Sequence, residues 1–123
     1  MMPNSHPLDG TWELLKAEMA GEAAPEELST RTRLRLADGL YWVFFDGLLT
    51  DRGRFETSEG TNAKALQLRG LEGPNEGRTL PCIYRHNGER LRVCYGLDGV
   101  APIRFATAAG EARYLATYRR IER

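Results

Sequence analysis

The chain has few of the residues from which catalytic and metal sites are usually built. It contains two cysteines and two histidines among 123 residues. The serines, Ser5, Ser29 and Ser58, all fall in predicted loops or near the N-terminus. A Ser-His-Asp triad needs a serine beside a histidine, and a zinc site needs several Cys or His ligands at a recognisable spacing. We therefore expect no catalytic residues, no metal ligands, no cofactor and no enzyme activity.

An excess of basic charge and a long apolar run are also missing. The chain has 17 Lys plus Arg and 17 Asp plus Glu, so its formal net charge is zero, whereas nucleic-acid binding usually needs a basic excess. No stretch approaches the roughly 18 apolar residues of a membrane span, and the N-terminus has no apolar signal-peptide core. We expect a cytoplasmic protein with no nucleic-acid partner and no membrane span. Residues 1–7 are predicted to form a flexible tail and residues 8–123 a single domain.

What the chain does contain is a regular series of turn signals. Asp38-Gly39, Asp46-Gly47 and Asn87-Gly88 favour two-residue type I′ turns, in which both central residues have positive φ. The stretches between turns alternate or are rich in β-branched and aromatic residues, which is typical of strands. Eight strands are predicted, over Thr11–Met19, Arg31–Ala37, Leu40–Asp46, Leu48–Thr57, Lys64–Arg69, Leu80–His86, Glu89–Gly96 and Ala112–Ile121. With one helical turn over Ala23–Ser29, this series predicts an all-β protein: an eight-stranded antiparallel up-and-down β-barrel.

The hairpin around Asn87-Gly88 predicts where the two cysteines point. With these two residues as the turn, Tyr84 pairs with Leu91 and Cys82 pairs with Val93. The apolar face then carries Cys82, Tyr84, Leu91, Val93 and Tyr95. The other face is basic and carries Ile83, Arg85, Arg90, Arg92 and Cys94. Cys82 is therefore predicted to be buried and Cys94 to be exposed and reactive, with no disulfide between them.

The hairpin around Asp38-Gly39 has a second face that is not simply polar. Alternation sends Leu34, Leu36, Tyr41, Val43 and Phe45 to the inner face. The outer face carries Arg33, Arg35, Trp42 and Phe44, with each arginine opposite an aromatic ring, which suits guanidinium–aromatic stacking. Such a patch favours an interaction surface. Three alternatives remain open: a homodimer through this face, a monomer in which the arginines or residues 20–30 cover the rings, or a different partner.

Several motifs occur in an order that is typical of one group of small domains. The first strand opens with Gly10-Thr11-Trp12 and the last ends with Tyr118-Arg119-Arg120-Ile121. Between them lie Ala24-Pro25-Glu26-Glu27-Leu28, Gly53-Arg54-Phe55, the stretch from Gly73 to Leu80 and the stretch from Ile83 to Cys94. From Leu8 to Ile121 the chain resembles the planctomycete-type lipocalin-like domain family. The resemblance implies a lipocalin-like barrel and little about activity.

In lipocalins, the Gly-x-Trp of the first strand closes the floor of the barrel beneath an arginine of the last strand. By resemblance, we expect Trp12 to lie at one end of the barrel. Alternation places Arg120 on the same face as Tyr118, so Arg120 is predicted to reach the Trp12 ring, or Arg119 if a bulge shifts the strand.

The predicted interior is rich in aromatic residues. Gly53 is predicted to mark a bulge, because plain alternation would send Phe55 outward. The residues predicted to point inward are Trp12, Leu14, Leu34, Leu36, Tyr41, Val43, Phe45, Phe55, Leu66, Leu68, Tyr84, Leu91, Val93, Tyr95, Ala116 and Tyr118. The candidate ligand-binding residues among them are Tyr41, Val43, Phe45, Phe55, Tyr84, Tyr95 and Tyr118. Two functions remain open: non-catalytic binding of a small, largely apolar ligand in the barrel, or a structural or protein-interaction domain with a filled barrel.

Overall fold

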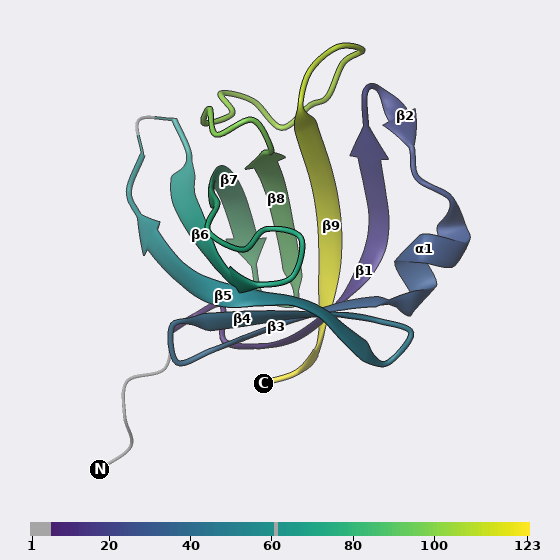
Figure 1. The fold of residues 1–123 in the computed structure, drawn as a ribbon, viewed down its shortest axis with the longest axis vertical. Helices are drawn as coiled ribbons and strands as arrows, with labels where there is room; N and C mark the ends of the chain where they lie inside the picture. The colour runs from purple at the N-terminus through teal and green to yellow at the C-terminus, as the bar shows by residue number, and fades with distance from the viewer. Residues whose placement is uncertain (1–5, 61) are drawn as a thin grey trace.

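The predicted eight-stranded barrel is confirmed by a computed structural model, which describes residues 6–60 and 62–123 (Figure 1). The strands are β1 (Gly10–Met19), β2 (Glu22–Ala23), β3 (Thr32–Ala37), β4 (Leu40–Phe45), β5 (Leu48–Ser58), β6 (Lys64–Glu72), β7 (Thr79–Asn87), β8 (Arg90–Gly96) and β9 (Arg113–Glu122). One short helix, α1 (Glu26–Arg31), is present among the described residues. No helix of the described part of the chain is long and apolar enough to cross a membrane.

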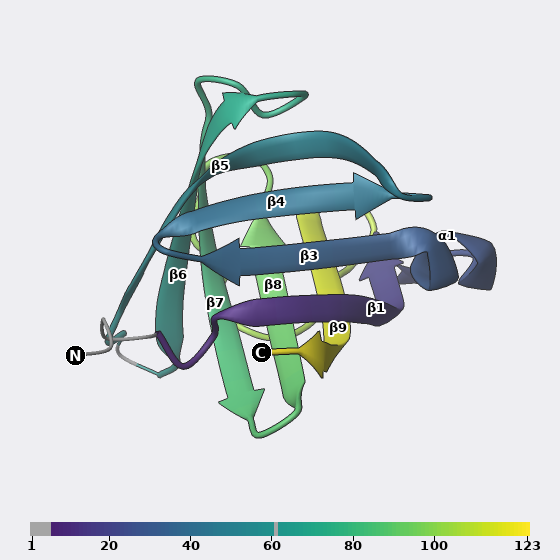
Figure 2. The ribbon, with the colours of Figure 1, turned by 90° about the horizontal axis from the view of Figure 1, so that it is seen from below.

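The barrel is closed by β1, which pairs antiparallel with both β3 and β9. The strands from β3 to β9 pair in chain order, which gives the predicted up-and-down arrangement. In Figure 1, β6 to β9 run upright and β3, β4 and β5 cross below them, whereas Figure 2 shows the outer face of β1, β3 and β4. The short strand β2 pairs antiparallel with the end of β1 in a hairpin, and the turn residues Ala20 and Gly21 have φ of 54° and 80°. This extra strand was not among the predicted ones.

The strand boundaries differ little from the predicted ones, and the main exception is β6. It was predicted to end at Arg69 but continues to Glu72, because Gly70 pairs with Gly53 of β5. The predicted helical turn is displaced toward the C-terminus, since α1 follows Pro25 and ends at Arg31.

The two predicted hairpin registers have different outcomes. Asp38-Gly39 is a type I′ turn with φ of 53° and 77°, and the predicted pairs across it, including Arg35 with Trp42, are present. The Asn87-Gly88 register is wrong, because Tyr84 pairs with Val93 and the turn residues are Gly88 and Glu89. Only Gly88 of that turn has positive φ, the pattern of a type II′ turn. The pairing is displaced by two residues, so every side chain keeps its predicted face.

The alternation of inward and outward residues in β5 reverses where this strand pairs with the end of β4. Its pairing with β4 shifts between Val43 and Phe44, so that Asp51, Gly53 and Phe55 point inward. The β5–β6 pairing also shifts beside Gly53, but this is not what turns Phe55 inward. Gly53 is required for packing, since a Cβ there would lie 2.5 Å from the Tyr41 ring and 2.1 Å from a backbone oxygen of β6.

The core consists of the inward side chains of all eight barrel strands. Most of the predicted inward residues are buried; Val43 and Phe45 are only half-buried because they lie near the end of β4. Core residues that were not predicted to be buried are Leu8, Ala17 and Leu80. Leu8 is fully buried although it precedes the first strand.

The prediction that Cys94 is exposed is wrong. Its side chain does leave the barrel on the outer face, but the β8–β9 loop (97–112) folds back over that face. Phe105 of the loop packs against the Arg85 and Arg92 guanidinium groups, whose carbons lie 4.8 and 5.5 Å from its ring centroid. Cys94 is fully buried beneath the loop, and its Sγ lies 3.9 Å from the Ala106 carbonyl oxygen. Both cysteines are free, as predicted.

Candidate functional site

Two tyrosines form a polar pair inside the barrel. The Tyr95 and Tyr118 hydroxyl oxygens, from β8 and β9, lie 2.6 Å apart, so one hydroxyl donates to the other. The Tyr114 ring packs beside Tyr95, with 5.5 Å between the ring centroids. Burial is the main cause that raises the pKa of both Tyr95 and Tyr118, so both stay protonated at neutral pH. This hydrogen bond uses one of the two hydroxyl protons and gives each hydroxyl oxygen a partner inside the barrel.

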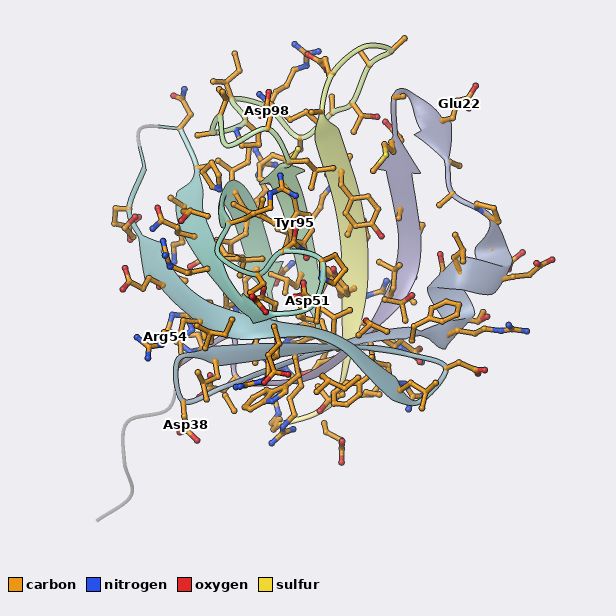
Figure 3. All side chains as sticks on the ribbon, in the orientation of Figure 1. Glu22, Asp38, Asp51, Arg54, Tyr95 and Asp98 are labelled. Atoms are coloured by element: carbon orange, nitrogen blue, oxygen red, sulfur yellow. The ribbon has the colours of Figure 1, made fainter. Side chains whose placement is uncertain are left out.

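A buried carboxylate closes the end of the barrel where β6 ends and β7 begins. Asp51 points inward from β5, and Asn75 of the β6–β7 loop (73–78) donates to its Oδ2 at 2.9 Å. The Tyr41 hydroxyl lies 3.4 Å from the same oxygen, which is longer than a good hydrogen bond. Figure 3 shows Asp51 beneath this loop. Gly73 allows the close approach, since a Cβ there would lie 2.6 Å from the Thr50 carbonyl oxygen.

The sequence could not have indicated this role of Asp51. With the two-residue Asp46-Gly47 turn, plain alternation places Thr50 opposite Val43 and pointing inward. The register shift before Phe44 reverses the pattern and turns Asp51 inward instead. Phe55 predicts an irregularity in this strand, but no residue type marks its position opposite the end of β4 rather than at Gly53.

Five of the predicted ligand-binding residues belong to the buried core, and Val43 packs against it. The predicted residues are Tyr41, Val43, Phe45, Phe55, Tyr84, Tyr95 and Tyr118. Among five pockets of the described residues, one of about 300 Å³ is lined by a member of this set, Tyr84. Aromatic rings and the Asp51–Asn75 hydrogen bond therefore occupy the region where an interior ligand was expected.

A large pocket lies outside the barrel, on the outer face of β5, β6 and β7. We call it the outer groove; its volume is about 470 Å³. Its apolar lining includes Ala65, Pro81, Ile83, Ala101, Pro102 and Ile103. Its polar lining includes Glu56, Ser58, Asn62 and Gln67. Nothing in the sequence predicts this groove, because it depends on where the β8–β9 loop folds.

The floor of the outer groove changes from polar to apolar across the sheet. One row of paired residues runs from Glu56 on β5 through Gln67 on β6 to Pro81 on β7. A parallel row runs from Ser58 through Ala65 to Ile83. The β5 side therefore offers hydrogen-bonding groups, and the β7 side offers an apolar surface.

The β8–β9 loop forms the apolar wall of the outer groove. Ile103 is 84% exposed, and Pro102 beside it is buried. The loop turns tightly after β8, since a Cβ on Gly96 would lie 2.0 Å from the Val100 carbonyl oxygen. The packing of Phe105 on two arginines holds the loop against the sheet.

The predicted tryptophan–arginine contact lies at the end of the barrel opposite to Asp51 and the β6–β7 loop. The Arg120 guanidinium carbon lies 4.3 Å from the Trp12 ring centroid, and Arg120 is only 7% exposed. Arg120 also donates to the backbone oxygens of Pro7 and Asp9, and Trp12 Nε1 donates to the Leu8 oxygen at 2.9 Å. Desolvation lowers the pKa of Arg120 from its usual high value. This contact joins the segment before β1 to the end of β9.

His6 adds to this closure, although it belongs to the predicted tail. The Leu8 backbone N–H donates to His6 Nδ1 at 3.0 Å, so Nε2 carries the proton and donates to Thr57 Oγ1 at 2.8 Å. The His6 ring also packs edge-on against Phe55. Burial is the largest cause that lowers the pKa of His6, because it disfavours the charged imidazolium. Residues 1–5 of the predicted tail lie outside the described residues.

The predicted interaction face carries the expected residues, but the predicted stacking of its arginines on its aromatic rings is not observed among the described residues. Trp42 and Phe44 are half-buried on the outer face of β4, opposite Arg35 and Arg33. Within the described chain, neither arginine forms a cation–π contact; Arg35 donates instead to Thr11 Oγ1 at 2.8 Å. The two rings are therefore not covered in the predicted manner.

No group of three or more His, Cys, Asp or Glu side chains in the described residues could hold a metal ion. Comparisons with protein-family models, with curated proteins and with solved structures give no match for this chain. Any function has to be argued from the geometry of the sites themselves.

Proposed function

We propose that the protein binds a small, largely apolar molecule without transforming it, and that the molecule lies in the outer groove. The observation that carries this proposal is the size of the groove, about 470 Å³, which is within the range of known small-molecule pockets. A binding site of this kind combines a mostly apolar lining with a few polar groups that orient the ligand. The outer groove has both.

The arrangement of the groove supports a ligand that is polar at one end. Its apolar body would pack against Ile83 and Ile103, on the side of β7 and the β8–β9 loop. Its polar group would lie near Glu56 and Gln67, on the side of β5. A carboxylate can only accept hydrogen bonds, so a ligand with a hydroxyl or amino group at that end is favoured.

A ligand position inside the barrel is less well supported than one in the outer groove. An interior ligand would have to displace aromatic side chains or the Asn75–Asp51 hydrogen bond. We also propose that the chain belongs to the planctomycete-type lipocalin-like family and that the protein is cytoplasmic. The closed barrel is compatible with that family, and the motifs at both ends of the chain, such as Gly10-Thr11-Trp12, support the assignment.

Binding of the neutral fluorescent probe Nile red tests the proposal. Ile103→Asp introduces a charge into the apolar wall at an exposed position, and we expect it to weaken probe binding by about tenfold or more. Leu48→Asp is the matched control, because Leu48 is 72% exposed in the β4–β5 hairpin and does not line the groove. Equal binding by wild type and Ile103→Asp would rule out this groove. Weaker binding by Tyr95→Phe alone would place the ligand inside the barrel.

A second candidate function is protein interaction through the outer face of β4. It is favoured by the half-buried rings of Trp42 and Phe44, which neither neighbouring arginine covers. Trp42→Glu tests it on size exclusion. If wild type elutes as a dimer and Trp42→Glu as a folded monomer, this face is an interface between two copies; a wild-type monomer at high concentration removes the homodimer.

A further inference from the structure

A second large groove lies on the other outer face of the barrel, over β1, β3 and β4. We call it the arginine groove; its volume is about 460 Å³. Figure 2 shows this face, with α1 and the β4–β5 turn at the same end. Its lining includes Thr11, Arg31, Arg33, Arg35, Phe44 and Glu122. It shares no lining residue with the outer groove.

The strand geometry explains why three arginines meet here. Arg33 and Arg35 occupy outward positions of β3, and alternate residues of a strand lie about 6.6 Å apart on one face. Arg31 is the last residue of α1, directly before that strand. Phe44 lies opposite Arg33 on β4, and Thr11 accepts a hydrogen bond from Arg35. Thr11 thereby holds one guanidinium in place.

These guanidinium groups have no anionic partner of their own. Five arginines elsewhere in the described chain form ion pairs, with partners such as Glu72 for Arg52. None of the three groove arginines forms an ion pair with any described residue. The groove also contains Asp46 and Glu122, and neither pairs with these arginines. Three positive charges against two negative ones favour a single compact anionic group over a long polyanion.

We propose that the arginine groove binds a small molecule that carries one phosphate monoester on an aromatic ring. Arginine forms paired, charge-assisted hydrogen bonds with phosphate oxygens, and neighbouring arginines on one strand can contact one phosphate group together. Phe44 supplies an aromatic surface beside them for the ring of the ligand. This site and ligand are distinct from the uncharged ligand proposed for the outer groove.

Calorimetric titration with phenyl phosphate tests the proposal, with inorganic phosphate and phenol as comparison ligands. Phenyl phosphate is expected to bind more tightly than either, since it alone offers both the charge and the ring. Arg33→Gln and Arg35→Gln are each expected to weaken its binding by about tenfold. Arg90→Gln is the matched control, because Arg90 is an exposed strand arginine that lies outside the groove, and it should leave binding unchanged.

Glu122→Gln should have the opposite effect to the arginine variants. It removes a negative charge from the groove lining at an exposed position, so it should tighten phenyl phosphate binding by several-fold. The proposal is overturned if phenyl phosphate does not bind at millimolar concentration, or if the arginine variants bind it as well as Arg90→Gln. Much tighter binding of a phosphotyrosine peptide would overturn the assignment to a free small molecule and identify a protein ligand.

Discussion

The two ends of the barrel are closed by different interactions. Where β9 ends, segments from opposite ends of the chain meet, and Trp12 packs beneath Arg120 with little exposure of either side chain. Where β7 begins, the β6–β7 loop closes the barrel, held by hydrogen bonds from Asn75 to Asp51 and from Arg78 to the Leu97 carbonyl oxygen. The first closure joins the two ends of the chain, so it forms only when the whole barrel is folded. The second closure involves a loop that can detach while the strands stay paired. We therefore expect the first end to control stability and the second to open more readily.

Trp12→Ala should give the largest loss of stability. Trp12 is fully buried, and replacing a buried tryptophan with alanine typically costs about 3–5 kcal/mol because it removes apolar contacts and leaves a cavity. Urea unfolding followed by circular dichroism measures the effect. Trp42→Ala is the matched control at a half-buried outer position and should cost far less. If both variants lose the same stability, the closure around Trp12 is not the main support of the barrel.

Asn75→Ala should have a smaller effect, at the other end. It removes the hydrogen bond to a buried carboxylate, which we expect to cost about 1–2 kcal/mol in the same urea experiment. Hydrogen exchange should increase in the β6–β7 loop, with little change near Trp12. A loss as large as that of Trp12→Ala would show that the two ends support the fold equally.

The smallest expected effect is a pH dependence that arises from His6. Its pKa is lower in the folded protein than the usual 6.5, so the unfolded chain binds more protons between the two pKa values. The free energy of unfolding should therefore fall as the pH decreases from about 6.5 toward the folded-state pKa, and His6 should add no pH dependence above that window. His6→Gln should remove this part of the pH profile. An unchanged profile in His6→Gln would contradict the observed hydrogen bonds of the ring.

The fold could be predicted from local signals, and the sites could not. Alternation and the Asp-Gly turns are properties of a few neighbouring residues, so strand positions and faces followed from them. The contact of Trp12 with Arg120 was also predictable, because it needs only the first and last strands to be neighbours. The register shift that turns Asp51 inward leaves no such signal.

The wrong prediction about the exposure of Cys94 has a simple physical cause. Alternation predicts on which side of a sheet a residue lies, but not whether another segment covers that side. Cys94 was placed on the correct face, yet the β8–β9 loop covers it. The same loop creates the outer groove, so the groove and the burial of Cys94 were missed together.

The burial of Cys94 makes this thiol a kinetic reporter of loop opening. A thiol reagent can reach Cys94 only when the β8–β9 loop leaves the sheet, whereas Cys82 lies inside the barrel and requires the barrel itself to open. The alkylation rate of Cys94 therefore measures how often the wall of the outer groove detaches, and that of Cys82 measures how often the whole fold opens. A ligand that binds against this wall would slow the alkylation of Cys94. Because it also stabilises the folded protein, it would slow the alkylation of Cys82 as well. The native chain can therefore be screened for ligands without an introduced label.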